Sequence, residues 1–157
     1  MGLIPPSDKM PSSKFISPEN LGTVKANENF TIEMAISNLE TGKFVNPDAS
    51  YFAAPQQLNS QNLIIGHSHF VIQPMSSFQD PKPLDPKKFA FFTAANTPAV
   101  NGVLSATVKG GLPVGNYKLS SINTAANHQP VLVPIAQHGS LDDAIYVSRN
   151  VIFDNTG

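Results

Sequence analysis

Residues 62–73, NLIIGHSHFVIQ, hold the strand pattern that decides the fold. Apolar side chains occupy both faces of this stretch, which predicts a central strand covered on both sides. His67 and His69 interrupt the apolar run and, being two residues apart, project from one face of a strand. Phe70 and Ile72 project from the other face, where we expect them to anchor the strand in the core.

Shorter strand patterns, separated by turns, fill most of the remaining chain. Residues 29–37, NFTIEMAIS, alternate apolar and polar side chains, as a half-buried strand does. Residues 102–110 and 117–123 predict a hairpin around the turn GGLPVGN. Residues 130–136, PVLVPIA, predict an edge strand because a proline breaks them, and residues 144–153 predict a last strand.

These short strands, with a turn about every ten residues, predict an all-β fold. An Ig-like β-sandwich with one short helix is the first expectation, and a cupin-like barrel is the alternative. Residues 1–20 are rich in Pro and Ser and show no period, so we expect an extended or mobile arm. Residues 21–157 then form a single sandwich domain, which agrees with the length of the chain.

The short helix is expected near a proline-rich segment. Asp85 followed by Pro86 predicts an N-cap and a first helical residue. Phe89 and Phe92 lie three residues apart, which suits one or two helical turns. We interpret these two rings and Phe91 as core residues.

Composition excludes several classes of function. The net charge is −1, so the chain carries no electrostatic footprint for nucleic acid or an anionic membrane. There is no cysteine, which excludes disulfides, thiolate ligands and cysteine nucleophiles. No apolar stretch approaches the roughly 20 residues that a membrane-spanning helix needs. The start, MGLIPPSDKM, lacks the apolar region of a signal peptide, whereas the sequon Asn29-Phe30-Thr31 is compatible with secretion.

The four histidines predict a metal site. Side chains of His67 and His69 on one strand face would start ~6.5 to 7 Å apart, close enough to converge on one ion. His128 and His138 each lie in a turn-like context, NHQP and QHGS, where loops at one end of a sandwich can meet. A set of histidines without thiolates suits copper or zinc. The alternative interpretation is that His67 and His69 are structural residues, hydrogen-bonded to neighbouring carbonyls.

Polar residues beside the two isolated histidines are candidates for an outer shell of the site. Asp142 and Asp143 follow His138 and are able to orient an imidazole or to bind the ion directly. Ser140 and Asp143 also have the spacing of a capping box, which favours a local structural role. Asn127 and Gln137 each precede a histidine and serve either as polar walls of the site or as turn formers.

Several long strings resemble a family of small secreted fungal proteins. They are TGKFVNP, YFAAPQQLN, IIGHSHFVIQ, DPKKFAFF, GLPVGNYKLSSINTAANHQP and PIAQHGSLDD, and they extend from about Asn27 to Val147. The resemblance implies a secreted protein whose leader has been removed. GHSHFVI, then GLPVGNYKL, then a histidine before a proline are also similar in order to a bacterial Ig-like domain rich in Gly and His.

Three hypotheses about function follow from these residues. The first is a secreted β-sandwich that binds one transition metal, copper before zinc, with no nucleic-acid or membrane partner. The second is a metal-free module that binds a cell-wall glycan or a host protein. The third is a metal-dependent enzyme, either a redox copper protein or a hydrolase, which would need an open coordination position beside a cleft.

Overall fold

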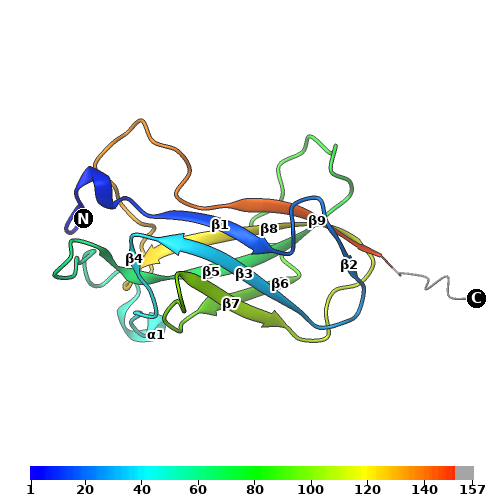
Figure 1. Cartoon of the computed structure of the whole chain (residues 1–157), viewed down its shortest axis with the longest axis horizontal. Helices are drawn as coiled ribbons and strands as arrows, with labels where there is room; N and C mark the ends of the chain where they lie inside the picture. Colours follow the sequence, from blue (N-terminus) through cyan, green and yellow to red (C-terminus); the bar gives the residue numbers. More distant parts are fainter. Residues whose placement is uncertain (151–157) are drawn as a thin grey trace, which may run out of the picture.

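The fold is a sandwich of two β-sheets, seen in a computed structural model that describes residues 1–150 (Figure 1). The smaller sheet has three strands in the order β1-β3-β7, and the larger sheet has six. The smaller sheet contains β1 (Ser12–Ser17), β3 (Phe30–Ser37) and β7 (Val103–Val108). The larger contains β2 (Thr23–Lys25), β9 (Ala144–Asn150), β8 (Gly115–Ala125), β5 (Ile64–Met75), β4 (Leu39–Glu40) and β6 (Phe91–Ala95).

The order of the strands is that of an Ig-like sandwich. Among the seven principal strands, the first, second and fifth in chain order form one sheet, and the others form the second sheet. Their pairings are antiparallel, and only the short β2 and β4 join the larger sheet in parallel. The expected all-β sandwich is therefore confirmed, and two separate sheets take the place of the alternative barrel.

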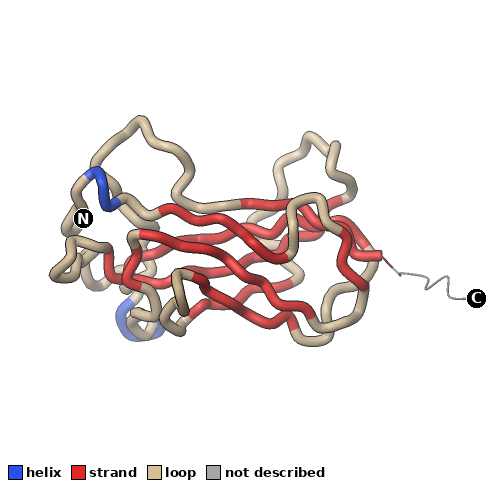
Figure 2. Tube along the Cα trace, in the orientation of Figure 1, coloured by secondary structure: helices blue, strands red, loops and turns tan. Residues whose placement is uncertain are grey.

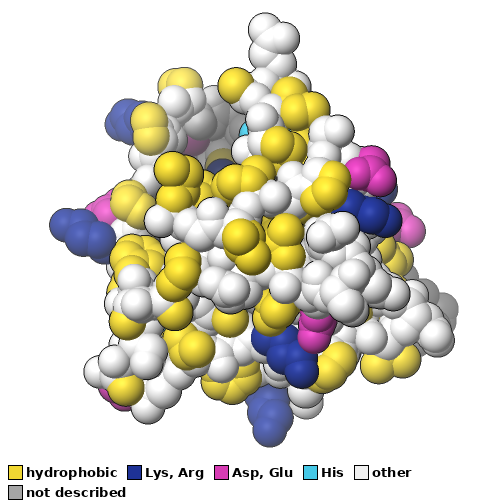
Figure 3. Space-filling view, turned by 90° about the vertical axis from the view of Figure 1, so that its left-hand side faces the viewer, with side chains coloured by type: hydrophobic (Ala, Val, Ile, Leu, Met, Phe, Trp, Pro, Cys, Tyr) yellow, Lys and Arg dark blue, Asp and Glu magenta, His cyan; other side chains and the backbone are white. Residues whose placement is uncertain are grey.

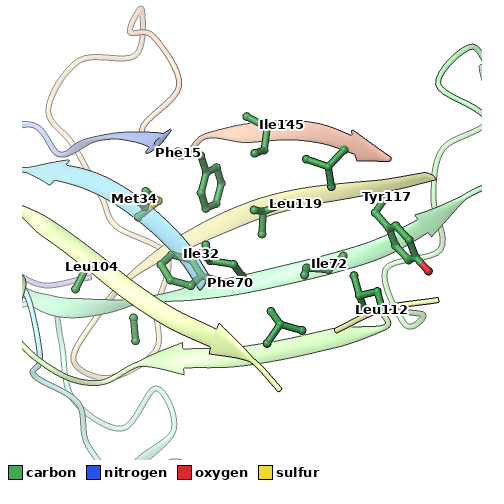
Figure 4. Close-up of a cluster of buried hydrophobic side chains, with 13 residues drawn as sticks. Phe15, Ile32, Met34, Phe70, Ile72, Leu104, Leu112, Tyr117, Leu119 and Ile145 are labelled. Carbon is green, nitrogen blue, oxygen red and sulfur yellow. The ribbon is translucent and has the colours of Figure 1, made fainter. Parts of the chain in front are cut away.

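Strand β5 is central, as the apolar pattern predicts. It pairs with β8 on one side and with β6 on the other, and the pairing of β5 with β8 extends over ten residues from Gly66–Ala125 to Met75–Asn116. Phe70 and Ile72 face the space between the sheets and are fully buried. Figure 4 shows both side chains packed against Phe15, Leu119 and other residues that come from both sheets.

The segment expected as an arm contains a strand of the smaller sheet. Residues Ser12–Ser17 pair with β3, and Phe15 is buried in the core. The Phe15 amide also donates to the Asp143 carboxylate at 2.7 Å, which ties β1 to the start of β9. β1 has six residues and one buried side chain, so the sequence shows no clear alternation of apolar and polar residues from which the strand could be predicted.

The short helix forms at a different place from the one expected. Helix α1 spans Pro47–Ser50, where the Asn46 side chain accepts from the Asp48 amide and Pro47 occupies the first turn. The helix predicted from Asp85 is wrong: Asp85 caps a single turn, and the chain then enters β6. Figure 2 shows α1 and the 3₁₀-helix Ser7–Lys9 (η1) as the two helical pieces of the described chain.

Three further expectations differ from the structure or lie outside it. The hairpin expected from residues 102–110 and 117–123 is wrong, because β7 lies in the smaller sheet and β8 in the larger. Residues 131–136 are irregular, and only the bridge between Pro130 and Thr124 remains of the expected edge strand. Residues 151–153, expected at the end of the last strand, lie outside the described residues. Within residues 1–150, no helix has the length and apolar character to cross a bilayer.

Candidate metal site

Three of the four histidines meet on the outer face of the larger sheet. His67 and His69 lie in β5, and His128 lies in the turn that follows β8. One ring nitrogen from each residue lies within 4.8 Å of the other two, and the structure therefore contains a histidine group able to hold a metal ion. The His67 ring is fully buried, and the other two are partly buried.

Strand alternation places the first two rings. His67 pairs with Thr124 and His69 with Ile122, so these four side chains share the outer face, opposite to Phe70 and the core. Gly66 precedes the pair, and a Cβ at this position would lie 1.9 Å from the Thr124 carbonyl oxygen. The glycine therefore permits the close approach of β8 to β5 beside the site, as its place in the sequence indicates.

The third ring is placed by a tight turn. The His128 amide donates to the Ala125 carbonyl at 2.9 Å, and His128 has a φ of 69°, in the left-handed region. Histidine is one of the residues enriched in this region, although the conformation is uncommon for a side chain other than glycine. The turn is closed by Asn127, whose side chain donates to the Ala54 carbonyl and accepts from the Gln129 amide. Asn127 therefore shapes the turn that carries His128.

The residues 43–45 fix the orientation of two of the rings. His67 Nδ1 lies 3.1 Å from the Lys43 carbonyl oxygen, and His128 Nε2 lies 2.8 Å from the Val45 carbonyl oxygen. A carbonyl only accepts, so each of these nitrogens carries the proton. The same segment is held by its own amides, which donate to the Gly66 and Ala126 carbonyls. Metal-binding histidines commonly donate their outer N–H to a carbonyl in this way, which leaves the inner nitrogen bare.

The inner nitrogens have the spacing of ligands to one ion. His67 Nε2 lies 3.1 Å from His69 Nε2. Two nitrogens bound at 2.0–2.1 Å to one ion lie about 2.9 Å apart at a right angle and about 3.3 Å apart at the tetrahedral angle. Because the His67 proton is on Nδ1, His67 Nε2 is an acceptor, open to the His69 proton, to a cation or to the Thr124 hydroxyl, whose oxygen lies 3.2 Å away. A proton there would still leave the inner nitrogen of His128 bare.

The surroundings of His67 and His69 disfavour protonation of their rings. Burial lowers the pKa of His67, an effect that the hydrogen bond to Lys43 offsets in part. Burial, followed by the nearby His67 and His128, lowers the pKa of His69 to about 4. His69 Nδ1 is also buried and has no hydrogen-bond partner among the described residues. Burial therefore favours the neutral form of His67 and His69, which is the form that metal coordination requires.

A pocket of about 430 Å³ opens over the site. His69 and His128 line it together with Thr124 and six apolar or aromatic residues: Pro47, Tyr51, Phe52, Phe92, Ile122 and Pro130. The Tyr51 ring stacks on His128 with centroids 5.6 Å apart, and the Phe92 ring lies 5.0 Å from that of His69. Phe92 is therefore a wall of the pocket and not the core residue that we expected, whereas Phe91 packs against the core.

The other candidates from the sequence lie elsewhere. His138 is exposed, its Nδ1 lies 2.6 Å from the Gly139 carbonyl oxygen, and it is not part of the histidine group. Gln137 is exposed in the same loop. Asp142 accepts from the Ser121 hydroxyl and the Asn123 amide, and Asp143 accepts from β1.

Alternation in β8 explains the position of the two aspartates. Ser121 and Asn123 are buried and face the side of the sheet opposite to Ile122 and Thr124. The loop that brings Asp142 and Asp143 to them therefore stabilises the end of the sandwich and does not reach the imidazoles. Burial raises the pKa of Asp142, against the effect of its two hydrogen bonds.

Sequence reasoning missed the parts of the site that have no side-chain signature. The Lys43 and Val45 carbonyls act through the backbone, and their positions depend on long-range pairing with Gly66 and Ala126. The aromatic residues Tyr51 and Phe52 lie in the turn that follows α1. Their stacking, with centroids 4.2 Å apart, has no periodic signal in the sequence.

Comparison with known proteins assigns the family. The model of the CLU5d N-terminal domain matches residues 13–150, which include all three clustered histidines and all of the described strands except the first residue of β1. The chain belongs to the CLU5d N-terminal domain family. It is 42% identical over 145 residues to the "Pathogenicity cluster 5 protein d" of the fungus Colletotrichum graminicola. This match confirms the fungal family expected from the sequence motifs.

The match covers the two proteins unequally. It includes 91% of this chain but 30% of the Colletotrichum protein, so the chain spans about a third of that relative's length. The CLU5d N-terminal domain is thus one part of the larger protein.

Proposed function

We propose that this domain binds one transition-metal ion, copper before zinc, through His67, His69 and His128. The observation that carries the proposal is the distance of 3.1 Å between His67 Nε2 and His69 Nε2, with the third imidazole beside them. The outer nitrogens of His67 and His128 already donate to carbonyls, so neither ring has to flip to offer its other nitrogen to an ion.

The donor set supports these two metals. Three imidazoles without a thiolate or a carboxylate suit Cu(II) and Zn(II), whereas Mg²⁺ and Ca²⁺ prefer oxygen ligands. Three protein ligands leave a fourth position for water or another molecule, as in catalytic zinc sites. His69 and His128 line the pocket, so this position faces the pocket.

Isothermal titration with Cu(II) and Zn(II) tests the proposal on protein that carries no polyhistidine tag. We expect one equivalent to bind to the wild type and to H138A, because His138 lies outside the group. The double variant H67A/H69A should bind the metal at least 100-fold more weakly than the wild type. Loss of a residue that only hydrogen-bonds to a ligand lowers metal affinity by roughly 10- to 100-fold, so the loss of two ligands should exceed it. Circular dichroism checks that the variants fold. Equal binding by the double variant and the wild type would refute the site.

We also propose that the protein is secreted. Asn29 of the Asn29-Phe30-Thr31 sequon is exposed, and its Oδ1 accepts from the Gly110 amide, which leaves the glycan-accepting nitrogen free to react. Expression behind a signal peptide in a eukaryotic host should give a product whose mass falls on treatment with an N-glycosidase, and N29Q should show no such fall. An unmodified wild-type product would remove this support for secretion.

A further inference from the structure

The pocket over the histidines has a lining without charged side chains. None of its lining residues is Asp, Glu, Lys or Arg. Tyr51, Phe52 and Phe92 are each about half exposed, at 57%, 54% and 46%. Exposed aromatic side chains gathered around one cavity mark a site where a ligand is buried.

Two groups of neighbouring rings meet at the pocket, and each includes a histidine of the site. Phe52, Tyr51 and His128 form a stack, with interplanar angles of 30° and 21° between neighbours. Phe89, Phe92 and His69 form a row of tilted rings, with angles of 49° and 32°. The centroids of the His69 and His128 rings lie 6.1 Å apart. A flat ligand in the pocket therefore meets aromatic rings from both groups beside the histidines.

Hydrophobic side chains cover much of the neighbouring end of the sandwich as well. Figure 3 views the end that carries the N-terminus and α1, and it shows charged side chains mainly toward the edges of this end. Very little histidine surface is visible there. The lining of the pocket, which has no charged side chain, favours uncharged ligands over polyanions or strongly cationic ones.

We infer that the pocket binds a small uncharged aromatic compound with a phenolic oxygen, and that this oxygen occupies the fourth position of the ion. The inference rests on the metal site proposed above. A volume of about 430 Å³ is well above the ~150 Å³ that holds one benzene ring, so one or two rings fit. The aromatic lining supplies ring stacking, and the ion supplies the only strong partner for an oxygen donor.

The probes are p-cresol, the aliphatic 4-methylcyclohexanol, and N-acetyltyrosine amide, which carries the same phenol on a peptide. Their dissociation constants are measured by NMR titration of zinc-loaded and metal-free protein, and the zinc content of every sample is determined separately. We expect p-cresol to bind zinc-loaded protein at least 10-fold more tightly than 4-methylcyclohexanol does. We also expect it to bind more tightly with zinc than without.

Two variants locate the binding. F92A should weaken p-cresol binding by about 3- to 10-fold through loss of one aromatic wall while it retains one equivalent of zinc. F78A is the matched control, because Phe78 packs on Tyr146 and does not line the pocket, and it should change binding by less than twofold.

Each outcome separates the two proposals. Retention of zinc without saturable p-cresol binding, or with equal binding by wild type and F92A, would overturn the ligand inference and leave the metal site standing. Tighter binding of the tyrosine amide than of p-cresol would overturn the assignment to a small molecule. Failure to retain either zinc or copper would overturn the metal site, and the phenolic ligand with it.

Discussion

At the scale of single residues, the site depends on imidazoles that are kept neutral by burial. His69 has a pKa of about 4 in the folded, metal-free chain, against an ordinary value near 6.5 in the unfolded chain. Between these two values the unfolded chain binds more protons than the folded one. The free energy of unfolding therefore falls as the pH decreases from about 6.5 toward 4, and His67 contributes in the same direction.

Urea unfolding of metal-free protein at pH 7 and pH 5 checks this pH dependence. The urea midpoint should be lower at pH 5, and the difference should shrink in H69F, whose ring can pack beside Phe92 but does not titrate. H138A should keep the wild-type difference, because His138 is exposed. A difference of the same size in H69F and the wild type would show that other groups cause the pH dependence.

Gly66 permits the close approach of two strands beside the site. In G66A the new Cβ would meet the Thr124 carbonyl oxygen at 1.9 Å, and backbone atoms must shift to accommodate it. We expect a loss of about 1–3 kcal/mol in the free energy of unfolding, as overpacking usually costs. Thermal or urea denaturation measures this loss. G139A has open space around its Cβ and should stay within about 0.5 kcal/mol of the wild type; a similar small change in G66A would be inconsistent with this packing.

At the scale of elements, β1 is a structural part of the sandwich. Phe15 is 4% exposed and packs edge-on against Phe70 of the central strand, with centroids 5.7 Å apart. F15A should therefore lower the free energy of unfolding by about 3–5 kcal/mol. Its neighbour Ile16 is 48% exposed, and I16A should cost less than about 1 kcal/mol. Equal, small effects of F15A and I16A on the urea midpoint would mean that β1 is a detachable arm.

The strands with a clear period could be predicted from the sequence. β3, β7, β8 and the central β5 alternate or are apolar on both faces, and each forms where its pattern indicates. α1 and β1 could not be predicted because they are short and depend on local caps or on long-range pairing. The segment after Asp85 shows the opposite case, since pairing of β6 with β5 overrides a local helix signal.

The same distinction holds for the site. The spacing of His67 and His69 gives their shared face directly, because strand alternation is local. The sequence predicted that both His128 and His138 join the pair, and which of them does depends on which loop returns to the outer face of β5. The left-handed turn at His128 and the hydrogen bonds of residues 43–45 bring His128 to the site. Neither feature has a local signature in the sequence.

At the scale of the whole molecule, the two faces of the larger sheet have separate roles. The inner face packs against the smaller sheet and forms the core, as Figure 4 shows. The outer face, near the end where α1 and the β8 turn lie, carries the histidines and the aromatic pocket. Variants on the outer face can therefore change the site while the core remains intact. The match to the fungal relative covers 30% of that protein's length.

The most direct test of the metal site is anomalous X-ray diffraction from crystals of the wild type loaded with copper or zinc and then washed. We predict one anomalous peak within about 2.0–2.2 Å of His67 Nε2, His69 Nε2 and the inner nitrogen of His128. A peak at His138 or on surface carboxylates, with these three imidazoles free of metal, would contradict the account.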